Sequence, residues 1–167
     1  MIVGTVKETF PGERRVALTP QILPALAKAG LEVLIESGAG TDAGYPDAVF
    51  TEKGAKIASS RAEVIEKDEV ICQGRGYGAY LEPGRADIEL LRKGQVAFCA
   101  FGPLTALDEV KATAATGATV FALELVPRIT RAQSMDILSS MATIAGYKAV
   151  LIAADHLPKM FPMMMTA

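Results

Sequence analysis

Short apolar runs alternate with helical patterns along most of this chain, and this alternation restricts its fold more than any other feature. Strands are predicted at residues 2–6, 32–35, 69–72, 95–100 and 119–123, and helices at residues 21–29, 47–53, 61–67, 88–93 and 107–116. Apolar runs without polar alternation are typical of strands buried on both faces, as in parallel sheets covered by helices. The sequence therefore predicts an α/β fold with a parallel sheet of about five or six strands covered by helices.

Cap and turn residues set the expected ends of these helices. Thr19 and Pro20 are expected to be the N-cap and the first residue of the first helix, and Gly30 is expected to end it. Gly94 and Gly117 follow predicted helices directly before strands, where a glycine commonly ends a helix.

Composition argues against several classes of function. Half of the residues are hydrophobic, so the chain is globular, and a net charge of −2 argues against a nucleic-acid surface. Cys72 and Cys99 are expected to be buried, reduced thiols of a cytosolic protein. With a single histidine and two scattered cysteines, no metal site is expected. No signal peptide is expected, and the apolar run 149–154 is too short to span a bilayer.

Two glycine-rich stretches follow predicted strands. The stretch 38–44 has the spacing GxGxxxG rather than GxGxxG, and Tyr45 and Pro46 prevent a helix from opening at its third glycine. It is expected to be a tight connection, with Pro46 in the first turn of the next helix. The stretch 74–78 is expected to be a flexible loop at the carboxyl end of a strand, where ligand clefts open in α/β proteins.

The segment 126–147 places polar side chains before an apolar helix. Residues 128–133 have no apolar periodicity and are expected to form a loop, whereas a helical pattern starts at Ile137. The start of a helix offers free N–H groups and a positive dipole end. Arg128, Gln133 and Asp136 add a planar donor, an amide and a carboxylate, a set suited to a ribose or an amide.

A purely structural interpretation of the same segment is equally open from spacing alone. Ser134 could cap the helix, with Asp136 in its first turn facing the dipole. Arg128 and Arg131 could be solvated charges of the loop. His156, the single histidine, is expected to interact with the C-terminal dipole of that helix.

Three stretches carry a resemblance to a known family. The stretch after Val126 reads PRITRAQSMDILSSMATIAGYKAV, and it resembles the NAD(H)-binding alpha subunit of proton-translocating nicotinamide nucleotide transhydrogenases. MIVGTVKETFPGERRVALTP and VLIESGAGTDAGYPDAVFTEKGAKI resemble the wider superfamily that includes the alanine dehydrogenases. The resemblance covers essentially the whole chain. It implies that Arg128, Gln133, Asp136 and Ser139 bind NAD(H), with Gln133 and Asp136 as the catalytic residues.

The alanine dehydrogenase branch supplies an alternative interpretation. In that branch an arginine at the position of Arg15 holds the substrate carboxylate, so Arg15 and Arg75 are candidates for a substrate cleft. The branch carries a lysine where this chain has Arg75, and a catalytic histidine where it has Gly102. A glycine cannot transfer a proton, which disfavours deamination of alanine. Such a dehydrogenase, or a partner domain without catalysis, remains the alternative, and Arg15 could be a solvated neighbour of Glu13.

The resemblance also implies an organisation and a setting. It implies a Rossmann-like N-terminal domain at 1–135, a long connecting helix at 136–155, and at 156–167 the start of a linker toward a missing dinucleotide-binding GxGxxG domain. The enzyme would transfer a hydride between NAD(H) in this subunit and NADP(H) on a partner subunit, coupled to proton translocation. Expected partners are membrane and NADP(H)-binding subunits and a second copy in a homodimer. The chain would be cytoplasmic, peripheral to the inner membrane through those partners, and inactive alone.

Overall fold

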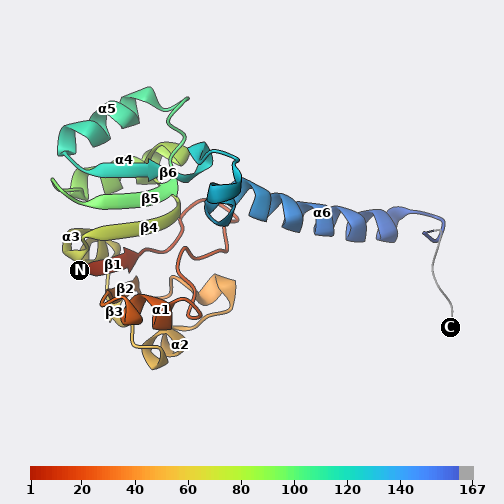
Figure 1. The fold of residues 1–167 in the computed structure, drawn as a ribbon, viewed down its shortest axis with the longest axis horizontal. Helices are drawn as coiled ribbons and strands as arrows, with labels where there is room; N and C mark the ends of the chain where they lie inside the picture. The colour runs from red at the N-terminus through yellow and green to blue at the C-terminus, as the bar shows by residue number, and fades with distance from the viewer. Residues whose placement is uncertain (162–167) are drawn as a thin grey trace. The chain divides into compact units, whose positions relative to one another are not determined.

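The first compact unit of the chain is built around one parallel sheet. The computed structural model describes residues 1–161, and the chain divides into the units Met1–Leu123 and Glu124–Ala167. In the first unit six strands pair in the order β3-β2-β1-β4-β5-β6, and every pairing is parallel (Figure 1). The strands are β1 (Ile2–Thr5), β2 (Glu32–Glu36), β3 (Lys56–Ala58), β4 (Val70–Arg75), β5 (Val96–Ala100) and β6 (Thr119–Ala122). The predicted α/β fold is confirmed.

Helices follow each of the first five strands and pack against the sheet through two separate cores. They are α1 (Leu23–Lys28), α2 (Asp47–Glu52), α3 (Arg61–Lys67), α4 (Leu81–Leu90) and α5 (Leu107–Thr116). Side chains alternate along β2, so Val33 and Ile35 pack with α1 and α2 while Leu34 packs with α3 and α4. Burial of both faces explains why the strands are apolar runs.

The helix ends differ from expectation in several places. The first helix begins at Leu23 with Ile22 as N-cap, so Thr19 and Pro20 lie before it. Pro46 is the N-cap residue of α2 rather than part of its first turn. Gly117 ends α5 as expected, in the left-handed conformation at φ 75° that glycine adopts without strain.

The fourth helix was expected at 88–93, which is wrong, because α4 begins seven residues earlier than that, at Leu81, and ends at Leu90. The stretch before it is also not a flexible loop: Gly74 and Arg75 belong to β4, and a 3₁₀ turn at Tyr77–Ala79 buries Tyr77 completely. Pro83 is tolerated in the first turn of α4, where its missing N–H is not needed. Gly84 is required by contact, because a Cβ there would lie 1.9 Å from the carbonyl oxygen of Tyr77.

Gly84→Ala is expected to lower the free energy of unfolding by about 1–3 kcal/mol, since the new methyl group must displace the Tyr77 backbone or the helix. Gly146→Ala is the matched control, because a Cβ at Gly146 meets nothing within 4 Å and alanine favours the helix. Urea denaturation of both variants measures the difference. A Gly84→Ala variant as stable as the control would contradict the close contact.

The second unit contains a 3₁₀ helix at Thr130–Met135 and the long helix α6 (Ile137–His156). By length and composition alone α6 could cross a membrane. From sequence, only the apolar run 149–154 was considered, which is too short to do so. Its apolar side chains are exposed and spread around the helix, including Ile144, Val150 and Leu151. His156 lies at its last position, with Nδ1 3.0 Å from the Ile152 carbonyl oxygen. The expected linker at 156–167 falls partly on 162–167, outside the described residues.

Candidate functional site

The polar segment before α6 is more ordered than a loop. A 3₁₀ helix spans Thr130–Met135, so the expected loop at 128–133 is wrong over most of its length. The N-cap of α6 is Asp136 and not Ser134. Asp136 Oδ1 accepts hydrogen bonds from the N–H groups of Leu138 at 2.9 Å and Ser139 at 3.0 Å. The carboxylate therefore satisfies two N–H groups that a bare helix start would leave free.

The side chain of Ser139 completes this cap. Its hydroxyl donates to Asp136 Oδ2 at 2.6 Å, and this bond is the main cause that lowers the pKa of Asp136. The N–H groups of Ser139 and Leu138 act in the same direction. Asp136 is thus held as an anion with both oxygens engaged, which makes it an anchor of the segment rather than a proton donor or acceptor.

Arg128 and Gln133 present their side chains differently from Asp136. Arg128 Nε lies 3.9 Å from Asp136 Oδ2, while the Arg128 side chain is 68% exposed and that of Asp136 only 7%. Gln133 is exposed, and its backbone carbonyl accepts from the N–H of Asp136 at 3.3 Å. The structure therefore brings Arg128, Asp136 and Ser139 into one cluster and places the Gln133 amide at the exposed side of the same turn. Binding of NAD(H) by these four residues stays a prediction.

In the first unit, Arg15 and Arg75 converge on one carboxylate at the carboxyl ends of the strands. Glu13 accepts from Arg15 Nε at 2.7 Å, and its Oε2 lies 3.6 Å from Arg75 Nε. The hydrogen bond from the Arg15 side chain is the main cause that lowers the pKa of Glu13 to about 2. Both arginines were expected in one substrate cleft. The structure brings them together around Glu13, whose negative charge offsets part of their positive charge. A substrate contact by either arginine stays a prediction.

The segment after β1 is bound to the end of β4 by further contacts. Glu8 accepts hydrogen bonds from the N–H groups of Gly74 at 2.6 Å and Arg75 at 3.0 Å. Burial raises the pKa of Glu8, and its effect outweighs that of these two hydrogen bonds, which lower the pKa. The Arg75 guanidinium lies 4.1 Å from the centroid of the Phe10 ring, a cation–π contact. The segment after β1 and the carboxyl end of β4 therefore form one polar platform, held together by the contacts of Glu8 and Phe10 with Gly74 and Arg75.

A largely buried ion pair supports that platform, and no sequence signal indicated it. Arg61 Nε and Nη2 each donate to the carboxylate of Asp87 at 2.6 Å, while Nη1 donates to the Lys7 carbonyl oxygen at 2.6 Å. Gln73 Nε2 donates to the same Asp87 carboxylate at 3.2 Å. Arg61 is the first residue of α3 behind the Ser60 cap, a position that on sequence alone indicates a solvated helix start.

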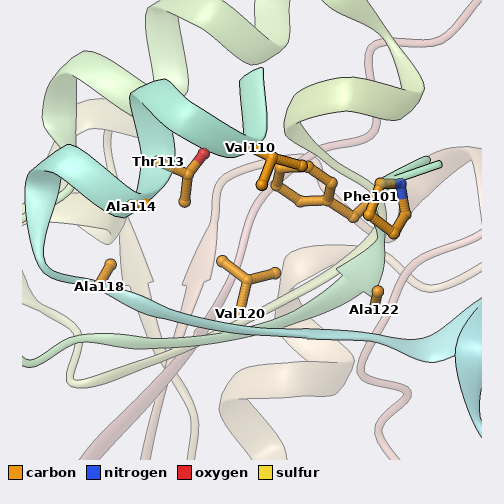
Figure 2. A pocket seen from close by; sticks show the side chains of 8 residues that line it. Phe101, Val110, Thr113, Ala114, Ala118, Val120 and Ala122 are labelled. Carbon is orange, nitrogen blue, oxygen red and sulfur yellow. The ribbon is translucent and has the colours of Figure 1, made fainter. Parts of the chain in front are cut away.

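A hollow between α5 and β6 lacks the chemistry of an active site. It has a volume of about 210 Å³ and lies between the helix and the edge strand (Figure 2). Its lining is apolar apart from one hydroxyl: Phe101, Pro103, Val110, Thr113, Ala114, Ala118, Val120 and Ala122. None of these side chains can carry charge or transfer a proton, so we place the site at the polar segments instead.

The cysteines do not form a cluster with other ligands. Cys99 is buried as expected, but Cys72 is only half-buried, which corrects the expectation for that residue. Cys72 pairs in register with Phe98, so Cys72 and Cys99 point to opposite faces of the sheet. Among residues 1–161 there is no group of three or more histidine, cysteine, aspartate or glutamate side chains that could hold a metal ion.

Comparison with known proteins gives consistent matches. The family described as "Alanine dehydrogenase/PNT, N-terminal domain" matches residues 4–145. An NAD(P) transhydrogenase alpha subunit protein of Rhodospirillum rubrum is 41% identical over the whole chain, which covers 43% of that protein. The solved transhydrogenase from Sinorhizobium meliloti has a TM-score of 0.86 at 38% identity. The match includes 100% of this chain and 48% of that one.

A solved L-alanine dehydrogenase is also similar, with a TM-score of 0.80 at 28% identity over 93% of this chain and 40% of that one. The chain thus spans less than half the length of each of these relatives. At Gly102, where the resemblance placed the catalytic histidine of alanine dehydrogenases, φ is 75°, a conformation that favours glycine.

Proposed function

The chain belongs to the family of alanine dehydrogenase/PNT N-terminal domains, and on this premise we propose that it forms part of the NAD(H)-binding alpha subunit of a proton-translocating transhydrogenase. The observation that carries the proposal is the segment 128–139, where Arg128 and Gln133 lie exposed beside the capped start of α6. In this proposal the domain supplies one wall of the NAD(H) cleft.

The donor set of this segment suits the nicotinamide end of the cofactor. The Gln133 amide can both donate and accept, which matches a carboxamide or a ribose hydroxyl, and the Arg128 guanidinium offers several donors. A phosphate fits less well at the start of α6, because Asp136 already occupies the N–H groups of Leu138 and Ser139 with a negative charge. The pyrophosphate is therefore assigned to the region of the subunit outside this chain.

The residues of the segment divide into two roles in this proposal. Gln133 and Arg128 position the nicotinamide and its ribose, while Asp136 and Ser139 hold the turn in shape. The bound nicotinamide supplies the redox chemistry by giving or accepting a hydride, so the protein needs to orient it and needs no acid or base at this wall. Asp136 thereby contributes to catalysis by positioning, which refines its expected catalytic role.

The remaining assignments follow from the same proposal. NAD(H) binds in this subunit, whereas NADP(H) and the proton path belong to partner subunits, and the alpha subunit forms a homodimer. The chain lies on the cytoplasmic side, attached to the inner membrane through those partners. The N-terminal domain expected at 1–135 and the connecting helix expected at 136–155, where α6 spans Ile137–His156, belong to the same proposal. Deamination of alanine is not proposed, because Gly102 has no side chain to transfer a proton.

Arg128→Ala in the complete alpha subunit is expected to weaken NADH binding about ten- to hundredfold, as loss of a charge-assisted hydrogen bond does. Arg131→Ala is the matched control, since Arg131 is exposed in the 3₁₀ helix that follows Arg128 and is assigned no contact with NADH. Calorimetric titration with NADH measures both affinities, and circular dichroism checks that α6 is intact. Equal affinities for the wild type and Arg128→Ala would contradict the assignment of Arg128.

A further inference from the structure

Asp68 joins α3 to β4 and is tied down through its backbone. It is the C-cap residue of α3, and its N–H donates to the Val64 carbonyl oxygen at 3.1 Å. Its own carbonyl oxygen accepts from Arg92 Nη2 at 2.9 Å and from Gln95 Nε2 at 2.7 Å. These three bonds fix where the side chain of Asp68 must lie.

The carboxyl group of Asp68 lies in a closed niche beside β1. The residue is 0% exposed, and a Cβ on Gly4 would come within 1.2 Å of Asp68 Oδ2, so the absence of a side chain at Gly4 makes room for it. Val64 of α3 lines the same niche. Within residues 1–161 neither carboxylate oxygen has a hydrogen-bond partner. A carboxylate in such a place loses its hydration without replacement.

Few charges face this niche from the surrounding elements. Arg92, from the connection between α4 and β5, is the cation that acts on Asp68, but its hydrogen bonds go to the backbone carbonyls of Asp68 and Glu66. From β4 the Cys72 thiol interacts with Asp68. Glu69 is turned to the N-terminus, where it accepts from the N–H of Ile2. Gly4 of β1 and Val64 of α3, which lie at the niche, carry no charge.

The neutral acid is the form that this arrangement favours. Burial raises the pKa of Asp68 to about 7, and the charge of Arg92 opposes the shift only in part. We propose that Asp68 is a proton-binding site of the folded domain, and that its ionisation loosens the contact of the α3–β4 junction with Gly4 in β1. The site is independent of the NAD(H) wall and would operate whether or not that assignment holds.

The pH dependence of stability follows from the direction of this shift. In the unfolded chain an aspartate has a pKa near its ordinary value of 3.8, whereas in the folded domain that of Asp68 is about 7. The protonated carboxyl therefore stabilises the fold fully below the unfolded pKa. That contribution is lost as the pH rises toward the folded pKa, because the folded domain then retains a proton that the unfolded chain has released.

Titration of the complete subunit labelled with ¹³C at its aspartate carboxyl groups tests the proposal directly. One carboxyl resonance is expected to titrate with a midpoint near pH 7. Asp68→Asn should remove that resonance and no other. If every aspartate titrates below pH 5, the proposal is wrong, and this test requires only the wild-type protein.

Thermal denaturation of Asp68→Asn provides the second readout. The variant imitates the neutral acid, so its melting temperature is expected to be close to that of the wild type at about pH 4, near the unfolded pKa, and to exceed it increasingly up to about pH 7, the folded pKa. Asp108→Asn, on the exposed face of α5, is the control and should show no such trend. A difference between Asp68→Asn and wild type that stays constant over this pH range would overturn the proposal.

Discussion

Asp87→Ala is expected to lower the free energy of unfolding by about 3–5 kcal/mol, one of the two largest effects predicted for this chain. The variant leaves the Arg61 guanidinium charged at a position where its side chain is only 21% exposed. It also removes the partner of the Gln73 amide. Glu36 Oε2, 3.7 Å from Arg61 Nη1, is too distant to replace the two bonds of 2.6 Å that Asp87 accepts.

Urea denaturation with a double variant separates the charge effect from loss of packing. Arg61→Met combined with Asp87→Leu removes both charges, so it is expected to be less destabilised than Asp87→Ala alone. Asp108→Ala is the surface control, because Lys111 and Asp108 form a pair whose side chains are 79% and 87% exposed. If Asp87→Ala destabilises the chain no more than Asp108→Ala, the ion pair does not support the platform at the strand ends.

The elements that sequence predicts well are those whose ends carry a local signal. The helix expected at 107–116 is α5, Leu107–Thr116, and the glycine that ends it is Gly117. The helix expected at 61–67 is α3, whose N-cap Ser60 accepts from the N–H of Glu63. In both cases the cap chemistry lies within a few residues of the helix it limits.

The elements that sequence misses depend on contacts between distant residues. The first turns of α4 were not predicted as helix, and there Gly84 fits against the carbonyl oxygen of Tyr77, a contact made only after the chain folds. The strand β3, Lys56–Ala58, is short and lies at the edge of the sheet, where three residues give no clear alternation. Tertiary packing outweighs local propensity at both places.

The candidate site, too, could be predicted from sequence only in part. The positions of Arg128, Gln133, Asp136 and Ser139 came from resemblance, but which residue caps α6 could not be decided from spacing, because Ser134 and Asp136 are both good N-cap residues. The structure resolves this through the hydrogen bonds of Asp136 to Leu138 and Ser139. The pair Arg61 and Asp87 is separated by 26 residues and had no sequence signal at all.

Gln133→Ala is expected to slow hydride transfer about a hundredfold in the assembled enzyme, while NADH binding changes much less. The Gln133 side chain is exposed at a turn that Asp136 holds in place, so the substitution should leave the turn and α6 intact. A neutral amide contributes to the orientation of the nicotinamide more than to the total binding energy. Ser134→Ala, one residue further along the same exposed 3₁₀ helix, is the matched control and should retain the wild-type rate.

The central claim is that this domain supplies the nicotinamide-facing wall of the NAD(H) cleft, and single-turnover stopped-flow tests it most directly. The measurement follows hydride transfer from NADH to an NADP⁺ analogue in the assembled enzyme at saturating NADH, for the wild type, Gln133→Ala and Ser134→Ala. We predict a rate constant about a hundredfold lower for Gln133→Ala alone. Equal rate constants for all three proteins would contradict the claim.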